Sequence, residues 1–223
     1  LDLFCGLGNF SLPLATRTRE VVGIEGDAGL VARAARNATR NAIANATFHM
    51  ADLFADSRGA PWARRHYDRV LLDPPRAGAR EVLPVVKRTP VLAGAGGYDT
   101  REVAHAAAEM HAAGATGLLS VTPYYNRPTP EGLYQHYRAV ADATPLPIVV
   151  YNVPGRTGCN VEAATLARLA TIPTIVGVKE AAGNMTQMAE IVNAVPKDFL
   201  VLSGDDALTL PLMAIGGHGI ISV

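Results

Sequence analysis

The chain has 223 residues, of which 49% are hydrophobic and 18% are charged, and its formal net charge is zero. This balance is ordinary for a globular protein and shows no basic surplus that would indicate nucleic acid. The two cysteines, Cys5 and Cys159, have neither zinc-ligand spacing nor a disulfide pattern, which indicates a reducing compartment. Without a signal peptide or an apolar run of about 18 residues, we expect a cytoplasmic protein with no membrane span.

Short apolar strands alternate with helices in the first part of the chain. We expect a helix that opens near Phe10 and a second one that Asp27 caps. This alternation predicts an α/β unit with a mostly parallel sheet. The expected strands cover residues 1–5, 21–25, 46–50 and 69–72.

A glycine turn, residues 6–9, follows the first of these strands, and Glu25 ends the second. A tight glycine turn lets the backbone approach a ligand, and an acid at the next strand end can accept hydrogen bonds from ribose hydroxyls. The pattern therefore fits a nucleotide-sized site. Plain turns between strands explain it equally well.

Three segments, Asp2–Phe10, Val22–Gly26 and Leu71–Gly78, resemble the RNA 5-methyluridine methyltransferase family, which uses S-adenosylmethionine. The resemblance covers about residues 1–86 and implies a Rossmann-like sheet with a methyl-donor site. That family's nucleophilic cysteine has no counterpart here, so the covalent attack on the base that methyl transfer needs is missing. RNA is therefore not an expected partner. The implied donor-site residues are Phe4, Asn9, Glu25, Asp52 and Asp73.

From residue 90 onward a strand, a loop and a helix recur roughly every 25 to 30 residues, the rhythm of a (β/α)8 TIM barrel. About six units are present, so we expect a partial barrel. Residues 90–97 are expected to form a strand that leads into a glycine loop. The other expected strands cover residues 117–121, 147–151, 174–178, 199–202 and 219–223. The expected helix caps are Thr100, Thr129, Asn160, Asn184 and the Asp205–Asp206 pair.

Lys179 follows the unbroken apolar strand 174–178. Burial at such a strand end lowers the pKa of a lysine and makes its amine a nucleophile that can form a Schiff base. The alternative is a lysine whose ammonium reaches out to water.

Tyr125 and Tyr151 follow the two preceding strands, and the loops nearby add Arg156, Glu180 and Asp205. Strand ends that converge on one barrel mouth can bring these groups together for carbonyl chemistry. The alternatives are half-buried packing for the tyrosines and a solvated turn for the arginine.

Five segments in this part closely resemble the dihydrodipicolinate synthase family: Val121–Pro128, Glu131–His136, Tyr151–Gly158, Gly177–Ala181 and Leu202–Asp206. The resemblance implies a lyase of lysine biosynthesis that condenses pyruvate with aspartate semialdehyde and needs no metal or cofactor.

That resemblance also implies a role for each site residue. Lys179 would form the Schiff base with pyruvate, and Tyr151 would donate and accept protons. Tyr125 would join the relay, normally from a neighbouring subunit of a homo-oligomer. Arg156 would hold the carboxylate of aspartate semialdehyde, and the backbone of Ile221 would contact pyruvate.

The sequence thus predicts a chimera of two truncated segments, residues 1–86 and 87–223. The first two strand-helix units of the lyase family are absent, so we expect an incomplete pyruvate-condensing lyase. A methyltransferase remnant and a non-catalytic fold are the alternatives. A single hybrid sheet, with the first strands in the missing barrel positions, is also open.

Overall fold

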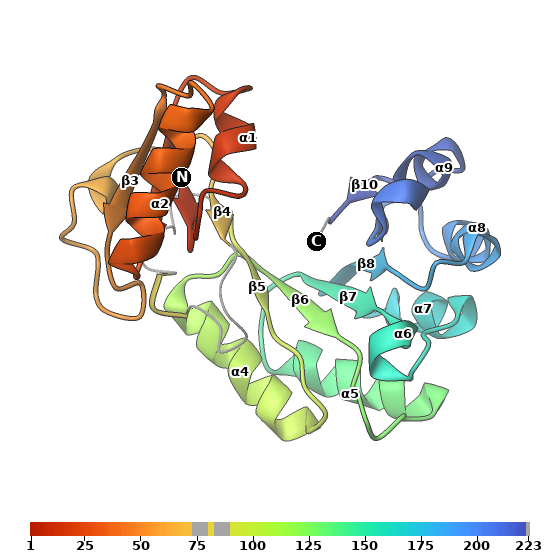
Figure 1. Cartoon of the computed structure of the whole chain (residues 1–223). Helices are drawn as coiled ribbons and strands as arrows, with labels where there is room; N and C mark the ends of the chain where they lie inside the picture. Colours follow the sequence, from red (N-terminus) through yellow and green to blue (C-terminus); the bar gives the residue numbers. More distant parts are fainter. Residues whose placement is uncertain (73–79, 83–89, 222–223) are drawn as a thin grey trace. The chain divides into compact units, whose positions relative to one another are not determined.

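Two separate parallel sheets organise the chain in the computed structural model, which describes residues 1–72, 80–82 and 90–221 (Figure 1). The contacts between residues divide the chain into one unit of residues 1–91 and another of residues 92–223. The alternative of one hybrid sheet is therefore wrong. The expected boundary between the two segments, at residues 86 and 87, lies outside the described residues.

The first unit holds a four-stranded sheet in the order β3-β2-β1-β4, with every neighbouring pair parallel. The strands expected at residues 21–25 and 46–50 are confirmed, whereas the first and fourth strands have two residues each. Its elements are β1 Asp2–Leu3, α1 Ser11–Ala15, β2 Val21–Glu25, α2 Ala28–Arg40, β3 Ala46–Met50, the 3₁₀ turn η1 Trp62–Arg64, β4 Leu71–Leu72 and the 3₁₀ turn η2 Arg80–Val82.

Capping and burial fix α2 beside this sheet. The side chain of Asp27 accepts a hydrogen bond of 2.9 Å from the N–H of Leu30, as its predicted role as a cap requires. Ala34 and Ala38 on the inner face of α2 are buried. Small side chains at this spacing let the helix pack closely on the strands and place Glu25 at the carboxyl edge of the sheet.

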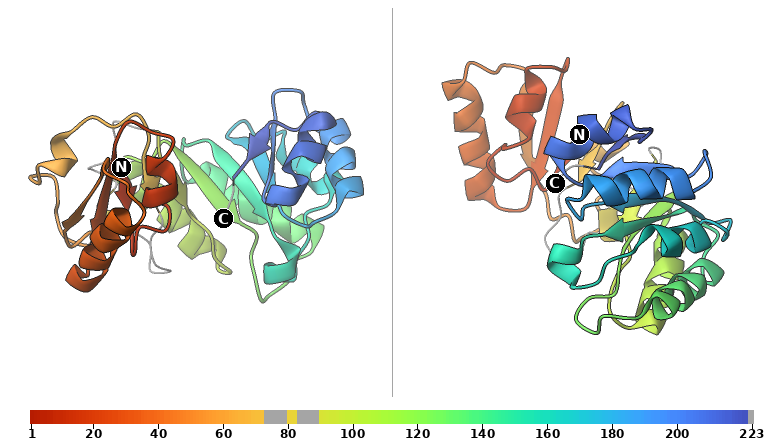
Figure 2. Two further views of the ribbon diagram at one scale, coloured as in Figure 1. Left: turned by 45° about the horizontal axis from the view of Figure 1, so that its top comes forward. Right: turned by 90° about the vertical axis from the view of Figure 1, so that its right-hand side faces the viewer.

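The second unit holds a six-stranded sheet in the order β10-β9-β8-β7-β6-β5, and every neighbouring pair is parallel. The sheet curves, and its helices lie along the outer side (Figures 1 and 2). Its strands are β5 Leu92–Gly94, β6 Gly117–Val121, β7 Ile148–Asn152, β8 Ile175–Glu180, β9 Leu200–Ser203 and β10 Gly219–Ile220. Its helices are α4 Thr100–Ala113, α5 Pro130–Asp142, α6 Pro154–Thr157, α7 Ala163–Leu169, α8 Met185–Ala194, the 3₁₀ turn η3 Asp206–Leu208 and α9 Thr209–Ala214.

This order confirms the predicted arc of about six units: it has six strands, and a helix follows each of the first five. Sequence neighbours are also neighbours in the sheet, so each helix returns the chain to start the next parallel strand. The central strands read as continuous apolar runs because both of their faces are covered. The successive residues Val149 and Val150 of β7, which face opposite sides of the sheet, are both buried. The carboxyl ends of these strands consequently lie along one edge of the sheet.

Three of the five expected caps are confirmed. The side chains of Thr129, Asn184 and Asp205 accept hydrogen bonds from backbone N–H groups at the starts of α5, α8 and η3. The expectation for Thr100 is wrong, because Asp99 caps α4 by accepting from the N–H of Arg101. Asn160 does not cap either: α7 begins at Ala163, and the Asn160 amide bonds to other side chains.

Candidate functional site

Lys179 is the next-to-last residue of β8, and only 1% of it is exposed. It pairs in register with Tyr151 on β7, and its Nζ lies 4.2 Å from the centroid of the Tyr151 ring. Among the described residues, Nζ makes no hydrogen bond or ion pair. Desolvation lowers the pKa of Lys179 below that of an ordinary lysine. The amine is thus buried beside a phenol ring, and the alternative of a lysine that reaches out to water is wrong.

A close backbone approach from β9 confines this amine. A Cβ added to Gly204, just after β9, would lie 2.9 Å from Cε of Lys179 and 2.6 Å from Cβ of Ala181. Any larger residue at position 204 would therefore displace the lysine stem. No local pattern marks this glycine as special, although it lies inside the segment Leu202–Asp206, between Ser203 and Asp205.

Of the other predicted lyase residues, two are exposed and the third is tied to β9 by its backbone. Tyr125 is 92% exposed and has a φ of 74°, a left-handed conformation that is unusual for a tyrosine. Arg156 is exposed in the single turn of α6. The N–H of Ile221, just after β10, donates a 2.9 Å hydrogen bond to the carbonyl of Ser203. The structure therefore joins Lys179 with Tyr151 and leaves Tyr125 and Arg156 on the surface.

Glu180 was expected in a loop beside the lysine, and that expectation is wrong. It is the last residue of β8 and is fully buried. Because side chains alternate along a strand, Glu180 faces the opposite side of the sheet from Lys179. Its carboxylate accepts hydrogen bonds from Asn152 Nδ2 at 2.8 Å, Ala182 N at 2.7 Å and Gln187 Nε2 at 3.3 Å. Burial raises the pKa of this carboxyl group above its ordinary value.

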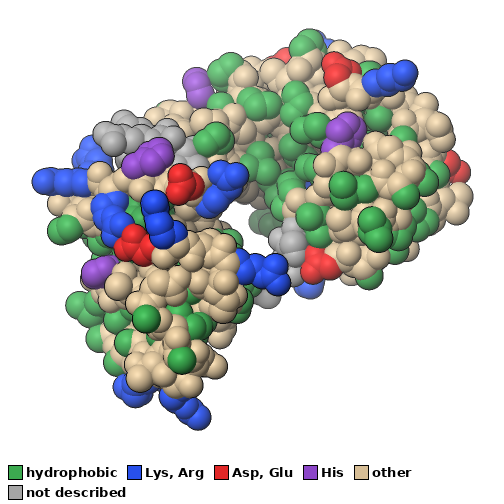
Figure 3. Space-filling model, turned by 90° about the horizontal axis from the view of Figure 1, so that it is seen from above, with side chains coloured by type: hydrophobic (Ala, Val, Ile, Leu, Met, Phe, Trp, Pro, Cys, Tyr) green, Lys and Arg blue, Asp and Glu red, His purple; other side chains and the backbone are tan. Residues whose placement is uncertain are grey.

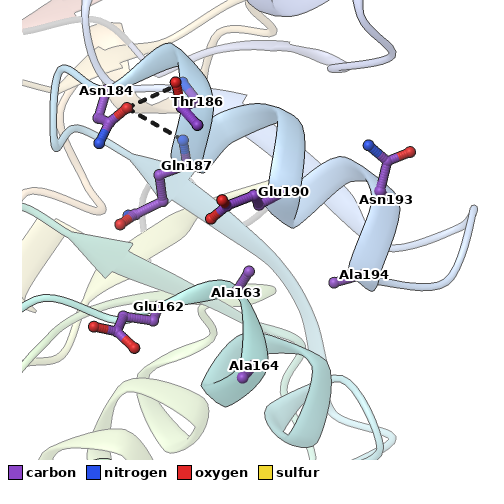
Figure 4. A pocket seen from close by; sticks show the side chains of 9 residues that line it. All are labelled: Glu162, Ala163, Ala164, Asn184, Thr186, Gln187, Glu190, Asn193 and Ala194. Atoms are coloured by element: carbon purple, nitrogen blue, oxygen red, sulfur yellow. Dashed lines mark hydrogen bonds between the residues drawn. The ribbon is translucent and has the colours of Figure 1, made fainter.

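A surface groove with a volume of about 740 Å³ lies between α7 and α8. Figure 4 shows Asn184 at the start of α8 bonded to the backbone N–H groups of Thr186 and Gln187. Gln187 lies between this groove and the buried carboxylate of Glu180. The lining residues are Glu162, Ala163, Ala164, Asn184, Thr186, Gln187, Glu190, Asn193 and Ala194.

In the first unit, backbone groups surround the Glu25 carboxylate. Oε2 accepts a 3.0 Å hydrogen bond from the N–H of Gly6 in the glycine turn, and Oε1 accepts from the N–H groups of Gly26 at 2.8 Å and Asp27 at 3.1 Å. These bonds tie the end of β2 to the glycine turn that follows β1. A ribose hydroxyl at this carboxylate would have to share it with the backbone donors.

The remaining predicted donor-site residues lie at the same edge of this sheet or beyond the described chain. Phe4 has a φ of 64°, and its ring lies 5.6 Å from that of Phe54. Asn9 and Asp52 are exposed, and Asp52 Oδ1 accepts from the N–H of Phe54 at 2.9 Å. Asp73 lies outside the described residues.

Basic side chains are more frequent on the part of the surface that the first unit forms, whereas hydrophobic and uncharged side chains dominate the face of the second unit in the same view (Figure 3). Arg19, Arg65 and Arg69 line a cavity of about 410 Å³ together with Glu20 and Asp68. Arg65 and Glu20 form an ion pair of 2.7 Å there. The positive charge of this cavity is thus partly neutralised.

Within residues 1–72, 80–82 and 90–221, no group of three or more His, Cys, Asp or Glu side chains is arranged to hold a metal ion. None of the helices in these ranges is both long enough and apolar enough to cross a lipid bilayer.

A curved parallel sheet with helices outside it and a buried lysine at its strand ends defines an α/β protein of the barrel class. The chain belongs to the dihydrodipicolinate synthetase family, whose model matches residues 80–223. A methyltransferase domain model matches residues 1–109. The two matches confirm the prediction of a chimera.

Curated proteins of similar sequence match about two thirds of this chain. A 4-hydroxy-tetrahydrodipicolinate synthase of Syntrophus aciditrophicus is 54% identical over 139 residues, which are 62% of this chain and 48% of that protein. One from Moorella thermoacetica is 55% identical over 145 residues, 65% of this chain and 50% of that protein. The chain spans about half the length of the curated relatives it matches.

Solved structures of dihydrodipicolinate synthases also match part of this chain. A dihydrodipicolinate synthase of Bacillus anthracis has a TM-score of 0.62 at 46% identity and covers 65% of this chain and 50% of its own. The enzyme of Cyanidioschyzon merolae, solved with lysine bound, has a TM-score of 0.64 at 40% identity and covers 77% of this chain and 63% of its own. The predicted partial TIM barrel is in this respect confirmed.

Proposed function

We propose that the second unit is the Schiff-base half of a lyase that condenses pyruvate with aspartate semialdehyde, the reaction of 4-hydroxy-tetrahydrodipicolinate synthases in lysine biosynthesis. The observation that carries this proposal is the buried amine of Lys179, 4.2 Å from the Tyr151 ring centroid. A desolvated lysine with a lowered pKa has the unprotonated amine that attack on a carbonyl requires.

In this proposal, Nζ of Lys179 attacks the keto carbon of pyruvate, and loss of water leaves an iminium. The iminium draws electrons from the methyl carbon, which loses a proton to give an enamine without a metal or an organic cofactor. The enamine carbon then attacks the aldehyde carbon of aspartate semialdehyde, whose oxygen takes up a proton, and the iminium forms again. The amino group of the semialdehyde adds to the iminium carbon and displaces Nζ, which closes the ring of the product and regenerates the lysine. Tyr151, whose ring adjoins the amine, is the proposed donor and acceptor of protons.

The other roles follow from the family to which the chain belongs. Arg156 holds the carboxylate of the semialdehyde in this proposal, and the backbone at Ile221 contacts pyruvate. Tyr125 completes the relay in a second copy of the chain, which agrees with its 92% exposure. We therefore also propose a homo-oligomer.

For the first unit we propose a Rossmann-like methyltransferase sheet that binds S-adenosylmethionine, in a segment that ends near residue 86. The strand order β3-β2-β1-β4 and the match to a methyltransferase domain support this assignment. Phe4, Asn9, Glu25 and Asp52 are the proposed contacts, with Asp73 beyond the described residues. Both cysteines are free and buried, which supports a cytoplasmic location.

The test of the lyase proposal is reductive trapping. Borohydride added with isotopically labelled pyruvate should attach the label to Lys179, as peptide mass spectrometry can show. Lys179→Ala should remove the label, and Lys197→Ala, which changes an exposed lysine, should keep it. A folded sample without label, or with label only on Lys197, would refute the proposal.

A heat measurement tests the methyl-donor assignment of the first unit. Isothermal calorimetry with S-adenosylmethionine should show binding that weakens in Glu25→Ala. Equal heats in the two proteins, or no heat at millimolar donor, would rule out the assignment.

A further inference from the structure

A second pair of side chains lies directly behind the amine and the phenol. Strand register pairs Lys179 with Tyr151 and, one position further, Glu180 with Asn152. Successive side chains on a strand face opposite sides, so the first pair faces one side of the sheet and the second pair faces the other. Both Glu180 and Asn152 are fully buried.

Amide groups from three elements close a network around Glu180. Nδ2 of Asn152 donates to Glu180 and also to Oδ1 of Asn160 at 2.9 Å, while its Oδ1 accepts from the N–H of Val161 at 3.0 Å. Gln187 of α8 donates to Oδ1 of Asn160 at 3.1 Å and accepts from its Nδ2 at 2.7 Å. The network thus joins the ends of β7 and β8 to α8 and to the segment before α7.

The composition of this network is unusual for a purely stabilising contact. Among the described residues, no cation faces the Glu180 carboxylate, which accepts only from amide and backbone N–H groups. Well-packed apolar side chains at such positions generally stabilise a fold as well as buried charges do. What directed hydrogen bonds add is a fixed geometry, here at the two strand ends that carry the amine and the phenol.

We propose that Glu180 is a positioning residue: through Asn152 and Gln187 it fixes the ends of β7 and β8 so that the Lys179 amine stays buried beside the Tyr151 ring. The inference rests on the proposed role of Lys179 as the Schiff-base lysine. Glu180 itself faces away from that lysine and does not touch the substrate.

The test uses the whole chain with three variants. Glu180→Gln keeps the shape but offers one oxygen where the carboxylate offers two. Its NH₂ group therefore faces either the N–H of Ala182 or the donors of Asn152 and Gln187, and at least one hydrogen bond is lost. The double variant Asn152→Asp/Glu180→Gln restores a hydrogen bond between the two positions with donor and acceptor exchanged, but it removes the Nδ2 group that donates to Oδ1 of Asn160. Glu190→Gln is the matched control, because it makes the same change at an exposed position on α8.

Two measurements are made on each protein. The first is the rate of borohydride trapping of pyruvate on Lys179. The second needs no substrate: it is the pH profile of Lys179 acetylation by acetic anhydride, read by mass spectrometry against Lys197 in the same sample.

In Glu180→Gln we expect trapping to slow by about tenfold or more, because small displacements of reacting groups have effects of that size. The acetylation midpoint should rise toward the ordinary lysine value of about 10.4, since a displaced amine regains water. The double variant should recover part of both values, since it restores one bond of the network, and Glu190→Gln should match the unchanged protein.

A folded Glu180→Gln protein with unchanged acetylation and trapping would overturn the inference, as would a lower melting temperature with an unchanged Lys179 profile, which indicates a structural role alone. If Glu180→Gln does not fold, Gln187→Leu removes one donor, and an unchanged profile there is equally decisive. If the unchanged protein traps no pyruvate, the proposed function fails, while the acetylation profile still decides the role of Glu180.

Discussion

The two units each place a charged side chain at the carboxyl end of a parallel strand, and they treat it in opposite ways. Glu25 ends β2 in a half-buried position, and three backbone N–H groups donate to its carboxylate. Lys179 near the end of β8 is buried against an aromatic ring, and desolvation lowers its pKa. Backbone hydrogen bonds thus hold the carboxylate in place, whereas burial destabilises the charged form of the amine.

We infer from this difference that Glu25 stabilises the fold, whereas Lys179 is a reactive amine. Hydrogen bonds to Glu25 hold the glycine turn in place, so loss of the carboxylate should weaken the first unit. Burial of an ammonium opposes folding, so loss of the Lys179 charge should strengthen the second unit. Trp62, the single tryptophan, is buried in the first unit, so its fluorescence follows that unit separately.

The largest effect should come from Gly204→Ala, which brings a methyl group against Cε of Lys179. Overpacking of this kind lowers the free energy of unfolding by about 1–3 kcal/mol and moves the amine. Borohydride trapping of pyruvate should be nearly lost in protein that remains folded by circular dichroism. Gly155→Ala is the control, since its Cβ would meet no atom within 4 Å. Normal trapping in Gly204→Ala would show that the lysine stem is not confined.

Glu25→Ala should destabilise the first unit by about 1–3 kcal/mol, because three backbone donors lose their acceptor, one in the glycine turn and two just after β2. Urea unfolding followed by Trp62 fluorescence measures this change. Asp68→Ala removes an exposed carboxylate from the same unit and should leave the midpoint nearly constant. If Glu25→Ala has the same urea midpoint as the unchanged protein, water replaces the carboxylate as an acceptor with no loss of stability.

Lys179→Met should stabilise the second unit by on the order of 1 kcal/mol at pH 7, since an apolar side chain of similar length avoids the desolvation of an ammonium. Because the folded-state pKa of Lys179 is lowered, the unfolded chain binds more protons between that pKa and the ordinary lysine value of about 10.4. The free energy of unfolding of the unchanged protein therefore rises with pH through that window. The extra stability of Lys179→Met over the unchanged protein should become smaller.

Urea unfolding followed by far-ultraviolet circular dichroism at pH 7 and pH 10 measures both parts of this prediction. Lys197→Met, at an exposed position, should show neither the gain nor its dependence on pH. A Lys179→Met protein that is less stable at pH 7 would contradict the assignment of a destabilised charge.

The smallest effect should come from Tyr125→Ala. With 92% of this residue exposed, its removal should change the free energy of unfolding by no more than about 0.5 kcal/mol. Thermal melting at low protein concentration measures it, with Tyr137→Ala as the contrast, because Tyr137 is fully buried and donates to the carbonyl of Ser120 at 2.9 Å. A large loss in Tyr125→Ala would mean that the side chain has a partner within the chain.

Local patterns were sufficient to predict much of this architecture. Apolar runs predicted all six strands of the second sheet, and the caps Thr129 and Asn184 marked the starts of two helices. Apolar runs and caps both depend on only a few neighbouring residues, so they can be recognised without knowledge of the fold. The same holds for the position of Lys179 near a strand end.

Contacts between distant residues were beyond such patterns. Strand β8 continues through Glu180, two residues further than the apolar run indicates, and this extension turns Glu180 to the outer face. Its partner Asn152 is 28 residues away, and Asn160, expected as a cap, belongs to the same network. The close approach of Gly204 to Lys179 likewise depends on the pairing of β8 with β9.

The sequence by itself determined two α/β segments, their strands and a lysine at the end of one of them, because hydrophobic period and turn residues act locally. The tertiary structure alone decided that the segments form separate sheets, that the amine lies beside Tyr151 and that Glu180 is buried behind it. Those facts depend on register and packing between elements far apart in the chain, where desolvation and hydrogen bonding set the chemistry of each group.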